Sequence, residues 1–114
     1  MANTIKYEEL KALLANNKGL ILIDVRSEEE VDRGRIPGSI HIPFQTVDAA
    51  LRMEPDDFKA KYGVGKPAPG SELVFYCQAG RRGEVATRRA QEQGHINARN
   101  YAGAYSEWSR RQKN

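Results

Sequence analysis

Two short runs of consecutive apolar residues constrain the fold more than any other feature of the sequence. Residues 20–23 read Leu-Ile-Leu-Ile, and residues 73–76 read Leu-Val-Phe-Tyr. A half-exposed strand alternates apolar and polar residues, whereas a strand covered on both faces does not, and such strands are typical of parallel sheets between layers of helices. The two runs therefore predict buried strands over Leu20–Asp24 and Leu73–Tyr76.

Helix and strand signals alternate along the rest of the chain. Ser27 and Glu30 have the spacing of a capping box, which indicates a helix that runs to about Arg33. Pro55 suits the first turn of another helix, because its missing amide hydrogen would have no partner there in any case. This alternation predicts an α/β fold with a mainly parallel sheet. The expected helices span Tyr7–Ala15, Ser27–Arg33, Thr46–Leu51, Pro55–Tyr62, Gly83–Gln93 and Ala104–Arg110, and the two further strands span Ser39–Ile42 and Asn97–Tyr101.

The length and residue types of the chain exclude several classes of protein. With 114 residues, of which 39% are hydrophobic, the chain is long enough for one compact core, so we expect residues 1–114 to form a single domain. Its longest aliphatic run is far shorter than the roughly 18 apolar residues of a membrane span. Residues 1–17 mix charged and apolar side chains and lack the apolar stretch of a secretory signal, so we expect a cytoplasmic protein.

Cys77 is the only cysteine, and it therefore cannot form a disulfide within the chain. His41 and His95 are the only histidines, and neither has the spacing to Cys77 or to the other that metal sites use. We therefore expect neither a disulfide framework nor a metal site.

The charge of the chain is unevenly distributed. The net charge is +3, but from residue 77 onward eight Lys and Arg residues face only three Asp and Glu residues. This cationic third is either a solvated basic face or an electrostatic funnel for a small anion. Nucleic acid is not an expected partner, because the basic residues are not interleaved with aromatic residues and match no common nucleic-acid motif.

The segment between the second buried strand and the next helix carries the strongest chemical signal. Residues 77–82 read Cys-Gln-Ala-Gly-Arg-Arg, at a junction where α/β sheets bind ligands. Backbone amides that curve from a strand into a helix can all point inward and bind an anion, assisted by the helix dipole. Gly80 permits the tight turn. These amides and the two arginines favour the thiolate form of Cys77, which predicts a nucleophile instead of a small buried apolar residue.

Several separate segments, in the same order along the chain, resemble the rhodanese-like sulfurtransferases, in particular their small single-domain members. The match covers essentially the whole chain. One departure is Ala102-Gly103, where many members have two glycines. The segments that carry the resemblance are Leu22–Arg26 with the acidic helix that follows it, Gly34–Pro43, Val74–Tyr76 with the loop that starts at Cys77, and Asn100–Trp108.

The resemblance implies a rhodanese-like fold with a central, mainly parallel sheet of five strands and helices on both faces. It implies that Cys77 takes a sulfane sulfur from thiosulfate or a similar anionic donor, holds it as a persulfide, and passes it to glutathione, to thioredoxin or, in a test tube, to cyanide. Arg82, with Arg81 as the alternative, would hold the charge of the departing sulfite. No metal or organic cofactor is expected. The residues implied in substrate binding are Gln78, Ala79, Gly80, Arg81, Arg82 and Gly83.

Polar and aromatic residues elsewhere in the chain are expected to have structural roles. For Asp24 and Arg26, at the end of the first buried strand, the resemblance implies that they tie loops together and do not take part in catalysis. His41 is expected to be a hydrogen-bonded residue and not a catalytic base. Tyr105 and Trp108, at helical spacing, are expected in the core or in a pocket wall.

Two other functions compete with sulfur transfer. Phosphatases and arsenate reductases share this fold, but their loop resembles Cys-x5-Arg, whereas Cys77 and Arg82 give Cys-x4-Arg. A non-catalytic interaction module of the same fold would more naturally lack the nucleophile, and Cys77 is present. The sequence therefore favours a thiosulfate sulfurtransferase over both alternatives.

Overall fold

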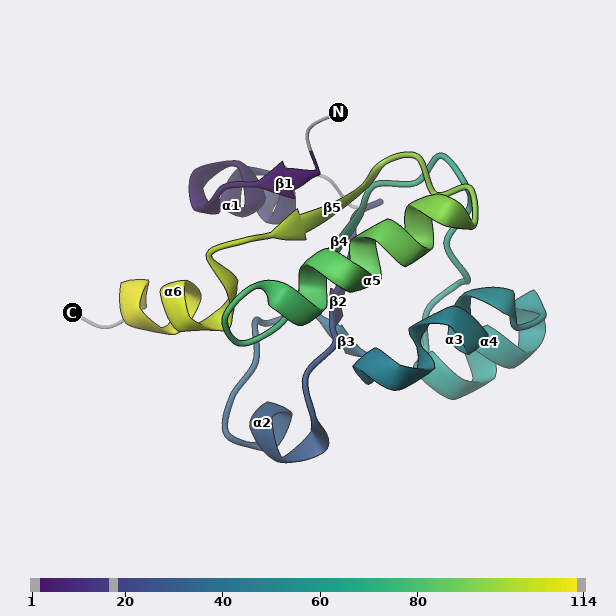
Figure 1. Ribbon diagram of the computed structural model, residues 1–114, viewed down its shortest axis with the longest axis horizontal. Coiled ribbons are helices and arrows are strands. Elements are labelled where there is room, and N and C mark those ends of the chain that lie inside the picture. The colour runs from purple at the N-terminus through teal and green to yellow at the C-terminus, as the bar shows by residue number, and fades with distance from the viewer. Residues whose placement is uncertain (1–2, 17–18, 113–114) are drawn as a thin grey trace.

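The computed structural model describes residues 3–16 and 19–112, which form a five-stranded sheet with helices around it (Figure 1). The strand order is β1-β5-β4-β2-β3, and each neighbouring pair is parallel. The strands are β1 (Thr4–Ile5), β2 (Ile21–Asp24), β3 (Ile40–His41), β4 (Leu73–Tyr76) and β5 (Ala98–Tyr101). The helices are α1 (Tyr7–Asn16), α2 (Glu28–Asp32), α3 (Val47–Arg52), α4 (Pro55–Tyr62), α5 (Arg81–Glu92) and α6 (Ala104–Arg111), with a 3-10 turn, η1 (Phe44–Thr46), before α3.

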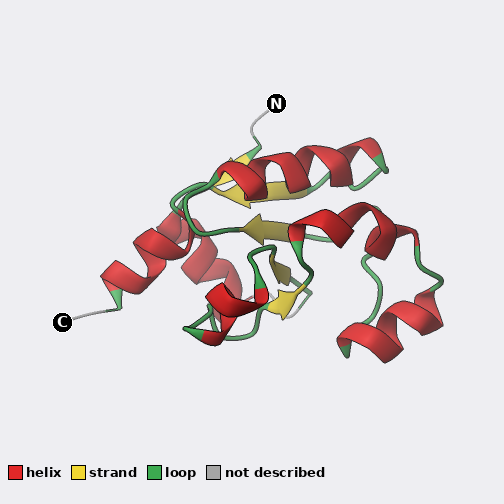
Figure 2. Cartoon of the chain, turned by 60° about the horizontal axis from the view of Figure 1, so that its bottom comes forward, coloured by secondary structure: helices red, strands yellow, loops and turns green. Residues whose placement is uncertain are grey.

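Alternate side chains of the central strands enter two separate cores. Ile23 of β2 and Phe75 of β4 pack with apolar residues of α3, α4 and α5. Leu22 and Val74, one residue earlier in the same strands, pack with residues of α1 and α6. Figure 2 shows helices on both sides of the strands. This two-sided burial explains why both strands are apolar at consecutive positions, and it confirms the predicted layers.

The structure confirms the predicted α/β class, and the predicted helices and strands agree with the observed ones to within one residue at each end, with two larger differences. β1 was not expected from the sequence pattern, because its two residues are too few for a periodic signal; it pairs with β5 at Thr4 and Ile5. α5 begins at Arg81, two residues before the predicted start, because the amide of Glu84 donates to the carbonyl of Gly80 at 3.0 Å and closes a turn there. No helix within the described ranges is long and apolar enough to cross a membrane.

The parallel sheet gathers the candidate site residues at one edge. Asp24, at the end of β2, is in register with Tyr76 at the end of β4 and with His41 at the end of β3. Cys77 follows directly after β4. Because the carboxyl ends of parallel strands meet at the same edge, these residues converge although up to 53 positions separate them in sequence.

Candidate active site

Cys77 lies at the bottom of a cradle of backbone amides between β4 and the start of α5. Its side chain is buried, and Sγ accepts hydrogen bonds from the amide of Gly80 at 3.0 Å and from the amide of Gly83 at 3.3 Å. Amides that converge on a sulfur atom stabilise its negative charge, and the positive end of the α5 dipole acts in the same direction. The arrangement can hold a thiolate or the outer sulfur of a persulfide.

The two glycines of the cradle allow an approach that other residues would block. Gly80 has a φ of 120°, and a Cβ atom there would lie 3.1 Å from the carbonyl oxygen of Ala102. At Gly83, a Cβ atom would overlap the side-chain oxygen of Asn100 and lie 3.3 Å from the Cα atom of Tyr76. Any larger residue at Gly83 would therefore push α5 away from the sheet and pull an amide away from the sulfur.

The start of α6 holds the outer side of the cradle. The amides of Tyr105 and Ser106 donate to the carbonyls of Cys77 and Gln78 at 2.9 and 3.1 Å. The first amides of a helix have no partner within that helix, so here they hold the loop carbonyls outward while the loop amides face the sulfur. Ala104, the residue before them, has a φ of 64°, a left-handed conformation that costs free energy in a residue other than glycine.

A buried ion pair ties the end of β2 to the cradle. Arg26 binds the carboxylate of Asp24 at 2.8 Å, with both side chains almost fully buried, and it also donates to the side-chain oxygen of Gln78 at 3.0 Å and to the carbonyl of Gly34. Its guanidinium stacks 4.2 Å from the ring centre of Tyr105. Burial acts to lower the pKa of Arg26, but hydrogen bonding and attraction to Asp24 outweigh it, so the pKa is raised. These contacts fit the structural role expected for Asp24 and Arg26.

The two adjacent arginines of the cradle have different surroundings. Arg82 binds Glu30 of α2 through two hydrogen bonds, at 2.9 and 3.0 Å, and this contact lowers the pKa of Glu30 to about 2. Glu30 also accepts a hydrogen bond from the amide of Ser27, which confirms the predicted capping box. Arg81 is exposed and forms no ion pair with any described residue. Within the described part of the chain, Arg81, and not Arg82, therefore has a guanidinium without an ion-pair partner.

The other predicted residues lie close to the positions expected for them. A ring nitrogen of His41 lies 2.7 Å from the carbonyl oxygen of Arg26, as expected for a hydrogen-bonded residue. Trp108 is buried in the core beneath α6, and Tyr105 stacks on Arg26 beside the cradle. Within the described ranges, no group of three or more His, Cys, Asp or Glu residues could hold a metal ion.

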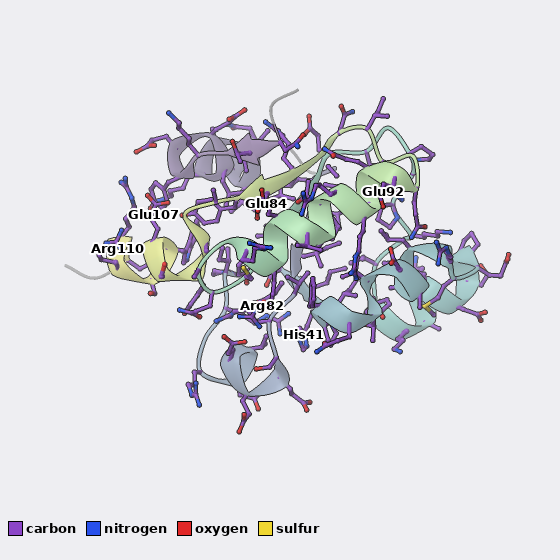
Figure 3. All side chains as sticks on the ribbon, in the orientation of Figure 1. His41, Arg82, Glu84, Glu92, Glu107 and Arg110 are labelled. Atoms are coloured by element: carbon purple, nitrogen blue, oxygen red, sulfur yellow. The ribbon has the colours of Figure 1, made fainter. Side chains whose placement is uncertain are left out.

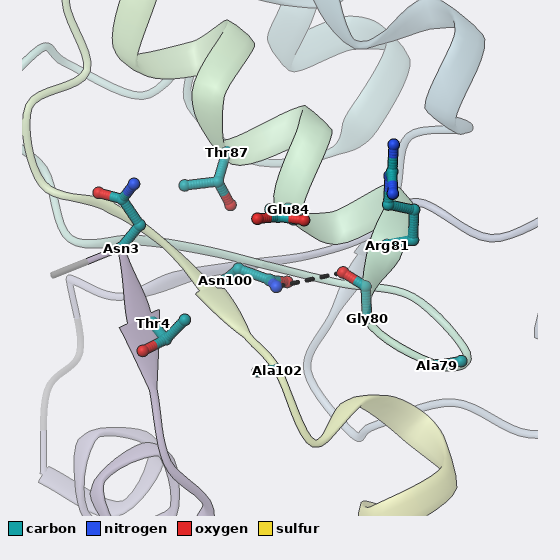
Figure 4. A pocket seen from close by; sticks show the side chains of 9 residues that line it. All are labelled: Asn3, Thr4, Ala79, Gly80, Arg81, Glu84, Thr87, Asn100 and Ala102. Carbon is teal, nitrogen blue, oxygen red and sulfur yellow. Dashed lines mark hydrogen bonds between the residues drawn. The ribbon is translucent and has the colours of Figure 1, made fainter.

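Two cavities flank the cradle, one on each side. The first, of about 300 Å³, which we call the α2-side cavity, is lined by Arg26, Glu30, Arg33, Gln78 and Tyr105. The second, of about 380 Å³, which we call the β5-side cavity, has walls that include Thr4, Gly80, Arg81, Glu84, Thr87 and Asn100 (Figure 4). Each cavity has one wall made by the loop that follows Cys77.

Two site residues were not expected from the sequence. Glu30 was identified only as a helix cap, and no sequence signal links it to Arg82, 52 positions away; Figure 3 shows Arg82 on the side of α5 toward α2. Asn100 is 3% exposed, and its amide nitrogen donates to the carbonyl of Gly80 at 3.2 Å. A polar residue within a buried strand was the available signal for Asn100, because such a residue needs a specific partner.

Comparison with known proteins agrees with this geometry. The family model of the rhodanese-like domain matches residues 6–111. A human protein named thiosulfate:glutathione sulfurtransferase is 49% identical over 94% of this chain and 93% of its own length, and a Saccharomyces cerevisiae protein of the same name is 32% identical over 90% of this chain and 74% of its own. The solved structure of a human single-domain sulfurtransferase superposes with a TM-score of 0.93 at 46% identity, covering 99% of this chain and 100% of that one. The chain therefore belongs to the rhodanese-like family.

Proposed function

We propose that this chain transfers the outer sulfur of thiosulfate to glutathione through a persulfide on Cys77. Thiosulfate sulfurtransferase activity follows from the family and from relatives that carry this name. The choice of Cys77 rests on one observation, the amides of Gly80 and Gly83 that converge on its sulfur. Covalent sulfur transfer needs a nucleophilic thiolate, and the sequence has no other cysteine.

In the first half-reaction, the Cys77 thiolate attacks the outer sulfur of thiosulfate. A bond forms between Sγ and that sulfur, the S–S bond within thiosulfate breaks, and its electron pair leaves with sulfite. The cradle amides stabilise the negative charge on sulfur before and after the transfer. The atoms and electrons balance without an external oxidant or reductant.

The two arginines take separate roles in this step. Thiosulfate and sulfite are dianions, and an unoccupied guanidinium can bind their oxygens with two hydrogen bonds. We assign this role to Arg81, because Glu30 already occupies the guanidinium of Arg82. The pKa of Arg82 is raised, mainly by its hydrogen bond to Glu30 and also by attraction to Cys77, so Arg82 supplies a fixed positive charge near the sulfur. This assignment reverses the order of the two arginines expected from the sequence.

In the second half-reaction, a thiolate acceptor attacks the outer sulfur of the persulfide. The S–S bond of the persulfide breaks, Cys77 leaves as a thiolate, and glutathione departs as glutathione persulfide. Thioredoxin, a protein thiol, is the alternative acceptor, and its use here stays a prediction. The cytoplasmic location and the action of residues 1–114 as one catalytic domain also stay predictions.

The experiment that tests this function follows the intact mass of the protein. Thiosulfate should add the mass of one sulfur atom to the native protein, and glutathione should remove it. Cys77→Ser should gain no sulfur and turn over no thiosulfate while keeping the native circular dichroism spectrum. A Cys77→Ser protein that uses thiosulfate at the native rate would overturn the assignment, and aryl phosphate hydrolysis without persulfide formation would favour the phosphatase alternative.

A further inference from the structure

The β5-side cavity carries two opposite charges that no described residue neutralises. Arg81 and Glu84 both lie in the first turn of α5, both are exposed, and neither forms an ion pair within the described ranges. Figure 4 shows the Glu84 carboxylate beside Thr87 and above Asn100, with Arg81 at the start of the helix. Both charges are therefore available to a ligand in this cavity.

Two buried polar side chains form the wall of this cavity beside Glu84. Thr87 is 1% exposed, and its hydroxyl donates to the carbonyl of Gly83 at 2.8 Å. Asn100 is 3% exposed; its Nδ2 atom donates to the carbonyl of Gly80, and its buried Oδ1 atom faces Gly83, where a Cβ atom would overlap it. The groups that a ligand can reach are therefore the carboxylate of Glu84 and the guanidinium of Arg81, and such a pair suits a group that carries both an ammonium and a carboxylate.

We infer that the β5-side cavity binds the γ-glutamyl end of glutathione, with its ammonium at Glu84 and its α-carboxylate near Arg81. This inference rests on the proposed function, since it places the acceptor of the second half-reaction. The cavity, at about 380 Å³, lies within the usual range for small-molecule sites. The γ-glutamyl end and the thiol of glutathione are about two residues of chain apart, roughly 7 Å, so a thiol held by its γ-glutamyl end extends beyond the Glu84 side of the cavity.

The cradle wall connects this cavity to the reacting sulfur. Ala79 and Gly80 line the cavity, and the amide of Gly80 is one of the two that bind Cys77 Sγ. Cys77 is not among the residues that line the cavity, so the thiol of a tripeptide bound here would approach the persulfide past the Ala79–Gly80 edge of the loop. Sulfite leaves before glutathione enters, so Arg81 can bind the donor in one half-reaction and the acceptor carboxylate in the other.

The α2-side cavity is less suited to this ligand. Its carboxylate, Glu30, already binds Arg82 and the amide of Ser27, and its buried cation, Arg26, already binds Asp24. The exposed Arg33 could bind a carboxylate, but the lining contains no unpaired carboxylate for the ammonium. An ammonium ligand would have to displace a bidentate ion pair to reach Glu30. The β5-side cavity requires no such displacement.

The test compares acceptors that carry the γ-glutamyl end with one that lacks it. The acceptors are glutathione, γ-glutamylcysteine and cysteinylglycine, each with saturating thiosulfate, and cyanide reports on the cradle itself. In Glu84→Gln, kcat/KM for glutathione relative to cysteinylglycine should fall by about threefold to fivefold. The ratio for γ-glutamylcysteine relative to cysteinylglycine should fall equally. Glu92→Gln, an exposed carboxylate at the far end of the same helix (Figure 3), is the matched control and should keep the native ratios.

Two other outcomes of this comparison would overturn the inference. Unchanged ratios in Glu84→Gln would mean that Glu84 does not bind the γ-glutamyl end. An equal loss of kcat/KM with glutathione, cysteinylglycine and cyanide would mean that the substitution damages the cradle and that Glu84 does not discriminate between acceptors. Failure of the proposed function is a separate result: the native protein would then form no persulfide with thiosulfate.

Discussion

The two sides of the cysteine cradle use their charged residues differently. On the α2 side, Arg26 and Glu30 each bind an oppositely charged neighbour, and the exposed Arg33 is the one charged residue of that cavity's lining without a described ion pair. On the β5 side, Arg81 and Glu84 are exposed and pair with no described residue. A charge bound to a neighbour fixes the position of the loop, whereas an unbound charge can contact a ligand. The α2 side therefore holds the paired charges that position the loop, whereas the β5 side offers both an unpaired cation and an unpaired carboxylate to a ligand.

The largest effect is expected from breaking the buried pair on the α2 side. Arg26→Met would leave the buried carboxylate of Asp24 without its cation, at a cost of about 3–5 kcal/mol in the free energy of unfolding. Urea denaturation measures this loss. Arg33→Met, an exposed cation of the same cavity, should change the free energy of unfolding by less than about 0.5 kcal/mol. Equal effects of the two variants would contradict a positioning role for Arg26.

The next effect concerns the cradle between the two sides. Gly83→Ala places a Cβ atom against the side chain of Asn100 and should cost about 1–3 kcal/mol of stability while slowing persulfide formation. Gly65→Ala is the control, because a Cβ atom at Gly65 meets no atom within 4 Å. Denaturation and single-turnover reaction with thiosulfate measure the two effects. A Gly83→Ala protein with native rates would show that the close approach of α5 to β5 does not matter for sulfur binding.

A smaller effect distinguishes the paired arginine from the unpaired one. Arg81→Ala should raise KM for thiosulfate by about tenfold, which corresponds to about 1.4 kcal/mol of binding free energy. Arg82→Ala should raise this KM less, because its guanidinium is occupied by Glu30. Arg88→Ala, an exposed arginine farther along α5, serves as the control. Steady-state kinetics with cyanide as the acceptor measure KM for thiosulfate in each variant. A larger increase in KM in Arg82→Ala than in Arg81→Ala would contradict the assignment.

The smallest effect is a pH dependence from Glu30. Its pKa is lowered to about 2 in the folded protein, from an ordinary value near 4.5, so its pair with Arg82 contributes stability above about pH 4.5 and loses it as the pH falls toward 2. Because Arg82 is 34% exposed, the contribution should stay below about 1 kcal/mol. Glu30→Gln should flatten this part of the pH dependence in denaturation between pH 5 and 2. An unchanged slope would mean that the pair adds no net stability.

Most of the fold could be predicted from the sequence because its signals are local. The consecutive apolar residues of β2 and β4 indicated strands covered on both faces, and Ser27 and Glu30 indicated a helix start. β1 escaped prediction, because two residues in an edge strand owe their conformation to pairing with β5 and not to their own pattern. The start of α5 was predicted two residues late, at Gly83, because Gly80 has no side chain that would mark a helix cap; the carbonyl of Gly80 nevertheless accepts the amide of Glu84 and closes the first turn.

The sequence by itself determined the reactive element of the site: a cysteine, a glycine and two arginines between a strand and a helix, where backbone amides must converge. Only the tertiary structure decided which arginine is free, because Arg82 meets Glu30 across 52 positions when α2 packs beside the start of α5. It also decided that Glu84 shares a cavity with Asn100, a residue of another element. The physical reason is that hydrogen bonding within a turn depends on neighbouring residues, whereas the pairing of side chains depends on how distant elements pack.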